Sequence, residues 1–126
     1  MDFSFTPAQE MLRKTVREFA EKEIAPKVAE MDETSEVPMD IIEKMAKLGF
    51  MGIMIPREYG GSGMGHIERA ILLEEIGYAS AAMANTLQVD HLGIAPIVIF
   101  GTEDQKKKWL PTCEKPSPTR ISMMPI

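Results

Sequence analysis

The chain has 126 residues, a formal net charge of −5, 44% hydrophobic residues and 26% charged residues. Such a composition is typical of a globular domain, and the length allows one modest core. The acidic balance argues against a general nucleic-acid binder, which needs a basic surface. The one basic run, 106–108, follows Glu103 and Asp104, so we expect it to be a solvated helix face.

Cysteine content and the search for targeting signals also restrict the kinds of site and the cell compartment that we expect. Cys113 is the only cysteine, so the chain cannot form an internal disulfide or a cysteine-based metal site. Residues 1–5 have neither the basic nor the apolar part of a signal peptide. The apolar run 94–100 is shorter than the about 20 residues that a membrane-spanning helix needs. We therefore expect a cytoplasmic protein without a membrane span.

The first predicted helix begins with a strong cap. Thr6 is a good N-cap, Pro7 suits the first helical position, and Gln9 has the capping-box spacing. Apolar residues then recur at helical spacing, namely Leu12, Val16, Phe19 and Ala20. Pro26 lacks the N–H that would bond to the fourth preceding carbonyl, so a kink or restart is predicted there, with a turn or two beyond it.

A second helix is predicted from Pro38, with Ile41, Ile42, Met45 and Leu48 on its apolar face. Gly49 followed by Phe50 predicts a left-handed C-cap with a hydrophobic contact. Residues 50–55 have the composition of a strand. A third helix is expected from Ile67 to near Gly77.

The last two predicted helices follow. Ser80 is positioned to cap a helix that runs through Met83, Leu87 and Leu92, is apolar nearly all round, and is therefore expected to be buried on several sides. Gly93 and Pro96 are expected to end it and to leave a short apolar segment, 97–100. Thr102 and Gln105 predict a capped helix that ends before Pro111. About six helices with short connections predict an all-α bundle.

Few residues suggest chemistry. The glycine cluster 60–65 precedes a helix, but its spacing is not G-x-G-x-x-G and no Walker lysine follows, so a loop is favoured over a phosphate site. His66 and His91 are the only histidines and have no metal-ligand spacing, and His91 is expected to be packed or at a rim.

Glu74 and Glu75 are formal candidates for a general base, but nothing in the sequence builds a pocket around them, so solvation or an ion pair is favoured. Five methionines fit either a pliable apolar cavity or, preferably, the core: Met45, Met51, Met54, Met64 and Met83.

Three segments in order resemble the acyl-CoA dehydrogenase family. They are Arg17–Pro26, the Ile-Pro-Arg-Glu-Tyr-Gly-Gly run at 55–61, and the Phe-Gly-Thr-Glu-Asp-Gln-Lys-Lys-Lys-Trp-Leu-Pro run at 100–111. The resemblance covers residues 1–111 and implies the amino-terminal helical domain, with 50–55 as an extended connector. A complete member of the family is about three times longer. Residues 112–126, which lack periodicity and the family's barrel motif, are expected to be a tail foreign to the domain.

The resemblance also implies a function. Family members oxidise an acyl-CoA to its 2,3-enoyl product with FAD and an electron-transfer partner, and their catalytic glutamate and most flavin contacts lie in later parts of the chain. We therefore expect no catalytic residue here, assign none to FAD, and expect this fragment alone to be inactive and to bind none. The fourth helix lines the acyl-chain pocket in the family, which makes Ala84, Asn85, Gln88 and Leu92 the candidate pocket residues; plain bundle packing is the alternative. Gln88 could close a short pocket, because a buried amide needs partners.

Two further expectations concern assembly. A stand-alone helical binding or assembly module without catalysis is the alternative function. Without the rest of the family fold, the fourth helix and the segment 97–100 would expose an apolar patch, so a homodimer or larger species is expected.

Overall fold

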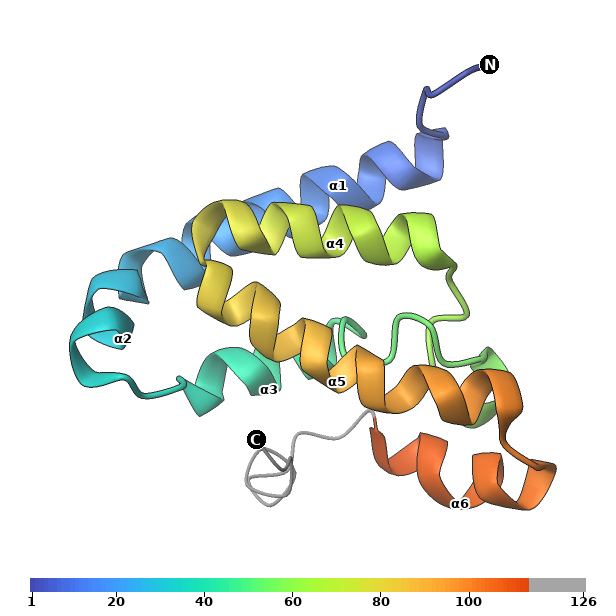
Figure 1. Ribbon diagram of the computed structural model, residues 1–126. Helices are drawn as coiled ribbons and strands as arrows, with labels where there is room; N and C mark the ends of the chain where they lie inside the picture. The colour runs from blue at the N-terminus through green and yellow to red at the C-terminus, as the bar shows by residue number, and fades with distance from the viewer. Residues whose placement is uncertain (114–126) are drawn as a thin grey trace. The chain divides into compact units, whose positions relative to one another are not determined.

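The computed structural model describes residues 1–113, and all regular structure in this range is helical (Figure 1). The α-helices are α1 (Pro7–Phe19), α2 (Val28–Thr34), α3 (Met39–Lys47), α4 (His66–Ala79), α5 (Ala81–Phe100) and α6 (Glu103–Cys113). The predicted all-α class is confirmed. Of the tail expected over 112–126, residues 112 and 113 continue α6 and the others lie outside the described residues.

The helices group into two compact units, which are described separately. The first contains residues 1–37 and 65–89, and the second contains 38–64 and, within the described range, 90–113. Helix α5 contributes residues 81–89 to the first unit and 90–100 to the second.

In the first unit, α1 begins and ends as its sequence predicts. The Thr6 hydroxyl accepts a hydrogen bond from the Gln9 amide at 3.2 Å, and the Gln9 side chain accepts one from the Thr6 amide at 2.9 Å. Before Pro26 the helix widens into a π segment, Ala20–Ile24, followed by a 3-10 segment, Ala25–Lys27. The N–H of Ala25 donates to the carbonyl of Ala20, five residues back, because Pro26 interrupts the α-helical ladder.

Helices α1 and α4 lie side by side (Figure 1). The core of this unit is shared among these two helices, the π segment, α2 and the first part of α5. The buried apolar side chains are Val16, Ala20, Ile24, Met31, Ile71, Leu72, Ile76, Met83 and Leu87. Full burial of one leucine or isoleucine contributes about 1.5–3 kcal/mol, so the burial of these side chains is a main source of stability for this unit.

In the second unit, α3 ends in a Schellman motif. Gly49 has a φ of +79°, its N–H donates to Ala46 at 2.9 Å, and the N–H of Phe50 donates to Met45 at 3.0 Å. The predicted left-handed cap is therefore confirmed. The connector 50–55 forms turns rather than a strand, with Phe50, Met51, Ile53 and Ile55 buried.

The loop after this connector is held against α6. Ile55, Tyr59, Ile94 and Leu110 form one buried cluster. The Tyr59 hydroxyl donates to the Glu103 carboxylate at 2.6 Å, and this hydrogen bond, followed by burial, raises the pKa of Tyr59 to about 12. A core residue of the loop is thus tied to the first turn of α6.

Two predicted helix ends are wrong. Helix α5 continues through Gly93 and Pro96 to Phe100, and α6 continues through Pro111 to Cys113. In each case a buried residue lies one or two positions before the proline: Ile94 is 2% exposed and Leu110 is fully buried. Both belong to the cluster around Tyr59, so tertiary packing outweighs the loss of one backbone hydrogen bond.

Gly61 and Gly93 offer a matched pair of substitutions. A Cβ at Gly61 would lie 2.0 Å from the carbonyl oxygen of Ile55, whereas a Cβ at Gly93 meets nothing within 4 Å. We expect Gly61→Ala to destabilise the chain by at least about 2 kcal/mol, since the backbone must move. Gly93→Ala should stabilise it by about 0.5–1 kcal/mol, because alanine favours a helix interior. Urea unfolding, followed by circular dichroism, measures the change in the free energy of unfolding for both variants. Equal changes would contradict the described loop.

Candidate functional site

The four candidate pocket residues all lie on α5. Ala84, Gln88 and Leu92 recur at intervals of four residues, so an uninterrupted helix places them on one face, with Asn85 beside them. Ala84 and Gln88 are half-buried, whereas Asn85 and Leu92 are exposed, Leu92 to 56%. The expectation that this helix is buried on several sides is therefore wrong for the described chain.

Gln88 has a charged partner that sequence reasoning missed. Its Oε1 accepts a hydrogen bond of 2.7 Å from Nη2 of Arg69 on α4. Both side chains are half-buried. Helices α4 and α5 also approach closely nearer the turn that joins them, where a Cβ on Gly77 would stand 3.5 Å from the Cβ of Ala84. The start of α4, His66-Ile67-Glu68-Arg69, is largely polar, so no signal in the sequence singles out Arg69.

Three surface hollows are described, and the candidate pocket residues line none of these three. One, of about 310 Å³, lies between the end of α5 and α6 beside Phe100 and Trp109. Another, of about 250 Å³, lies between α2 and the start of α5 and includes Met83. Met45 and Met51 are buried, and Met64 is 40% exposed. The four candidate pocket residues thus lie on a helix face and not in one of these three hollows.

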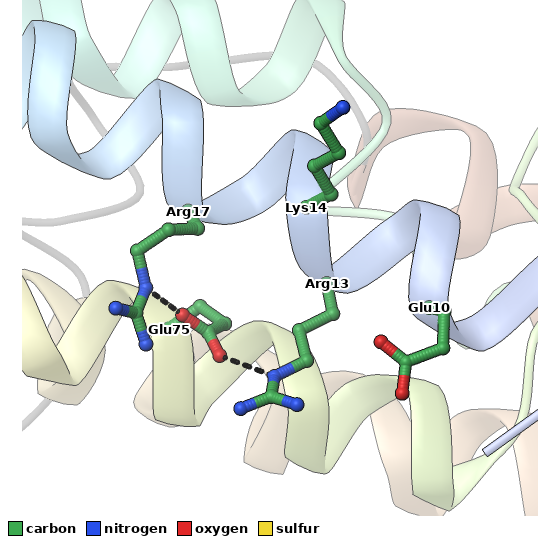
Figure 2. A pocket seen from close by; sticks show the side chains of 5 residues that line it. All are labelled: Glu10, Arg13, Lys14, Arg17 and Glu75. Atoms are coloured by element: carbon green, nitrogen blue, oxygen red, sulfur yellow. Dashed lines mark hydrogen bonds and ion pairs between the residues drawn. The ribbon is translucent and has the colours of Figure 1, made fainter.

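The third hollow, of about 270 Å³, is lined by an ion-pair network of the first unit (Figure 2). Glu75 on α4 is only 1% exposed, and its two carboxylate oxygens accept from two arginines of α1. Arg13 Nε donates to Oε1 at 3.0 Å, and Arg17 Nε donates to Oε2. Figure 2 shows both guanidinium groups turned toward Glu75, while Lys14 points away from it.

The charge of Glu75 is set by a balance of burial and pairing. Burial by itself would raise the pKa of this carboxyl, but the hydrogen bonds and charges of Arg17 and Arg13 outweigh burial and lower it below its usual value. Arg17 also stacks over the ring of Tyr78, with its guanidinium carbon 4.2 Å from the ring centroid. The ion-pair interpretation of Glu75 is confirmed, and its position between two cations does not suit a proton-accepting base.

The glycine-rich loop does not fit a phosphate or dinucleotide. Within the second unit, the N–H groups of residues 60–64 already donate to backbone carbonyls of 52–57, at 2.9 to 3.2 Å. In the first unit, the Gly65 N–H donates to Glu68 Oε2 at 3.0 Å. A phosphate-binding loop needs such groups free to point at the anion. The predicted absence of a phosphate loop agrees with this arrangement.

His91 is part of the core of the second unit. It is 2% exposed, and its Nε2–H donates to the carbonyl of Phe50 at 3.0 Å. Within residues 1–113, no three His, Cys, Asp or Glu side chains are grouped as metal ligands. Over the same residues, no helix has both the length and the apolar character needed to cross a membrane.

Comparison with known proteins gives one consistent result. The family model described as the acyl-CoA dehydrogenase N-terminal domain matches residues 6–115. A protein named probable acyl-CoA dehydrogenase from Bacillus subtilis is 46% identical over 112 residues, which are 87% of this chain and 29% of that protein. The chain thus spans less than a third of that relative.

Solved structures agree with the sequence comparison. Butyryl-CoA dehydrogenase from Megasphaera elsdenii is similar with a TM-score of 0.80 and 34% identity, over 91% of this chain and 31% of that one. A structure titled electron transferring flavoprotein of Acidaminococcus fermentans has a TM-score of 0.82 and 36% identity, over 92% of this chain and 31% of that one.

Substituting Glu75 tests the ion-pair network. We expect Glu75→Gln to lower the free energy of unfolding at pH 7 by about 2 kcal/mol, less than the about 3–5 kcal/mol of a fully buried pair, because both arginines remain partly in water. Chemical unfolding at a series of pH values measures this difference.

The pH dependence has a definite sign. The pKa of Glu75 is lowered in the folded chain, so its stabilisation is present above the ordinary value of 4.5 and is lost as the pH falls through the folded pKa. The difference between wild type and Glu75→Gln should therefore shrink below pH 4.5. The control is Glu74→Gln at the exposed neighbouring position, which should change stability by less than about 0.5 kcal/mol. A pH-independent difference would contradict the pairing.

Proposed function

Because the chain belongs to the acyl-CoA dehydrogenase family through its N-terminal domain, we propose that it forms the helical first domain of an enzyme that oxidises an acyl-CoA thioester to the 2,3-enoyl product. The observation that carries this proposal is the match over residues 6–115, together with the similarity in fold to butyryl-CoA dehydrogenase.

The chemistry itself is proposed to lie outside this chain. In the proposed enzyme a bound FAD accepts hydride from the substrate. We assign no residue of this chain to FAD, because the loop that could have held a phosphate uses its N–H groups internally. The described residues are proposed to contribute binding and shape rather than proton transfer.

The contribution we propose for this chain is one wall of the acyl-chain site. Ala84, Asn85, Gln88 and Leu92 would line it from α5. The small side chain of Ala84 leaves room for methylene groups, and Gln88 places a polar amide one turn further along. This arrangement supports a short acyl chain, in keeping with the similarity to butyryl-CoA dehydrogenase.

An electron-transfer partner and self-association are part of the same proposal. The similarity to a structure titled electron transferring flavoprotein supports an acceptor protein of that kind. In the second unit, Leu92, Ile99, Phe100 and Trp109 are exposed, which supports burial against a second copy when this chain is studied alone. A cytoplasmic location is also proposed, on the sequence grounds given above.

Activity of the longest natural reading frame that contains this sequence tests the proposed function. We expect the purified protein to be yellow and to reduce an artificial electron acceptor with butyryl-CoA while forming the enoyl product. A protein of residues 1–113 is the control, and it should be colourless and inactive because it lacks the proposed flavin and base regions. A flavin-free or inactive full-length protein would contradict the proposal.

Light scattering tests self-association of the 126-residue chain. Phe100 is 84% exposed, so Phe100→Glu should shift a dimer or larger species toward monomer by placing a charge in the apolar contact. Glu58→Gln, at an exposed position of the same unit, should leave the assembly unchanged. A monomeric wild-type chain at high micromolar concentration would show that the exposed apolar residues need no cover.

A further inference from the structure

We propose that the hollow beside Glu75 is a binding site for a small oxyanion, a carboxylate or a phosphate, held by the Nη atoms of Arg13 and Arg17. The hollow, of about 270 Å³, lies wholly within the first unit, where α1 faces α4 (Figure 2). The inference does not depend on the proposed function, because no residue that lines this hollow belongs to the proposed acyl-chain wall.

Each arginine keeps donors for a second acceptor. Both bonds to Glu75 use Nε, and the hydrogen bonds described for residues 1–113 leave the Nη atoms of both guanidinium groups over. The side chains of Arg13 and Arg17 are 45% and 36% exposed, so both still meet solvent. The planar edge of a guanidinium binds two oxygens of a carboxylate or phosphate at once. The hollow therefore offers a ligand two such groups.

Both guanidinium groups are held in place before a ligand arrives. Because they bond to the two oxygens of a single carboxylate, that of Glu75, they lie close to each other. An aromatic ring also covers a face of each. The guanidinium carbon of Arg13 is 5.9 Å from the ring centroid of Phe5, and that of Arg17 is 4.2 Å from the ring centroid of Tyr78. A ligand therefore loses less free energy in ordering these long side chains than it would with two unrestrained arginines.

The charge of the hollow fits one negative group. Its lining contains three cations and two carboxylates and so has a net charge of +1, from Arg13, Lys14, Arg17, Glu10 and Glu75. One arginine balances the buried carboxylate of Glu75, which leaves the charge of the other for a ligand. Figure 2 shows Glu10 on the far side of Arg13 from Arg17, so its carboxylate opposes an anion from the rim and does not separate the two arginines.

Titration of the ¹⁵N-labelled 126-residue chain with sodium phosphate and, separately, with sodium acetate tests the site. Sodium chloride at the same ionic strength is the reference. The measurement is the NMR shift of the Nε–H signals of Arg13 and Arg17, each identified by its loss in Arg13→Gln or Arg17→Gln. We expect at least one of the two oxyanions to saturate these shifts with a dissociation constant of about 1–10 mM. Saturation by phosphate alone or by acetate alone would identify the class of ligand, and saturation by both would show that the site reads only the shared oxyanion.

Two variants should move the affinity in opposite directions. Glu10→Gln removes a repelling charge at the exposed rim and should lower the dissociation constant about two- to fivefold. Arg13→Gln removes a charged donor and should raise it at least about tenfold. Lys22→Gln is the control, because Lys22 is an exposed cation of the same unit that does not line the hollow. It should change the dissociation constant less than about twofold.

The design stays decisive if one variant fails to fold. Circular dichroism reports the folding of each variant, and Glu10→Gln carries the test if Arg13→Gln is unfolded, since it leaves both ion pairs of Glu75 in place. Shifts that neither oxyanion saturates, or that chloride reproduces, would overturn the site. An unchanged dissociation constant in Glu10→Gln would place the bound anion elsewhere on the chain and would overturn it as well.

Discussion

The buried carboxylate of Glu75 is the interaction on which the first unit depends. A glutamate that is 1% exposed cannot be left unpaired, because desolvation of an isolated charge is very costly. Arg13 and Arg17 satisfy one oxygen each, from successive turns of α1. The apolar side chains around Glu75 could pack α1 against α4 in several registers, but the two directional ion pairs can form in only one of these registers. We regard specificity of packing, more than net stability, as the role of this network.

Much of the fold could be predicted from local sequence. The cap at Thr6, the interruption before Pro26 and the left-handed turn at Gly49 each follow from backbone chemistry within five residues. Such features need no knowledge of the rest of the chain. The continuation of α5 through Pro96 and of α6 through Pro111 was not predicted, because it depends on Ile94 and Leu110, which are buried against residues far away in sequence.

The candidate site was less accessible to sequence reasoning. The spacing of Ala84, Gln88 and Leu92 predicted a common helix face, and the continuous α5 is consistent with that spacing. The partner of Gln88 could not be predicted, since Arg69 precedes it by nineteen residues on another helix. Glu75 was recognised as a candidate for an ion pair, but its partners on α1 lie about sixty residues earlier. Pairings between helices come from packing geometry, which composition and periodicity do not encode.

The internal hydrogen bonding of the loop 60–65 has a consequence for engineering this chain. Glycine-rich loops are usually chosen for insertions, permuted termini and protease sites, because their backbone is assumed to open easily. Here each N–H of the loop is already committed to a carbonyl or carboxylate of the same chain. Cutting or lengthening this loop would therefore strip several backbone groups of their partners at once.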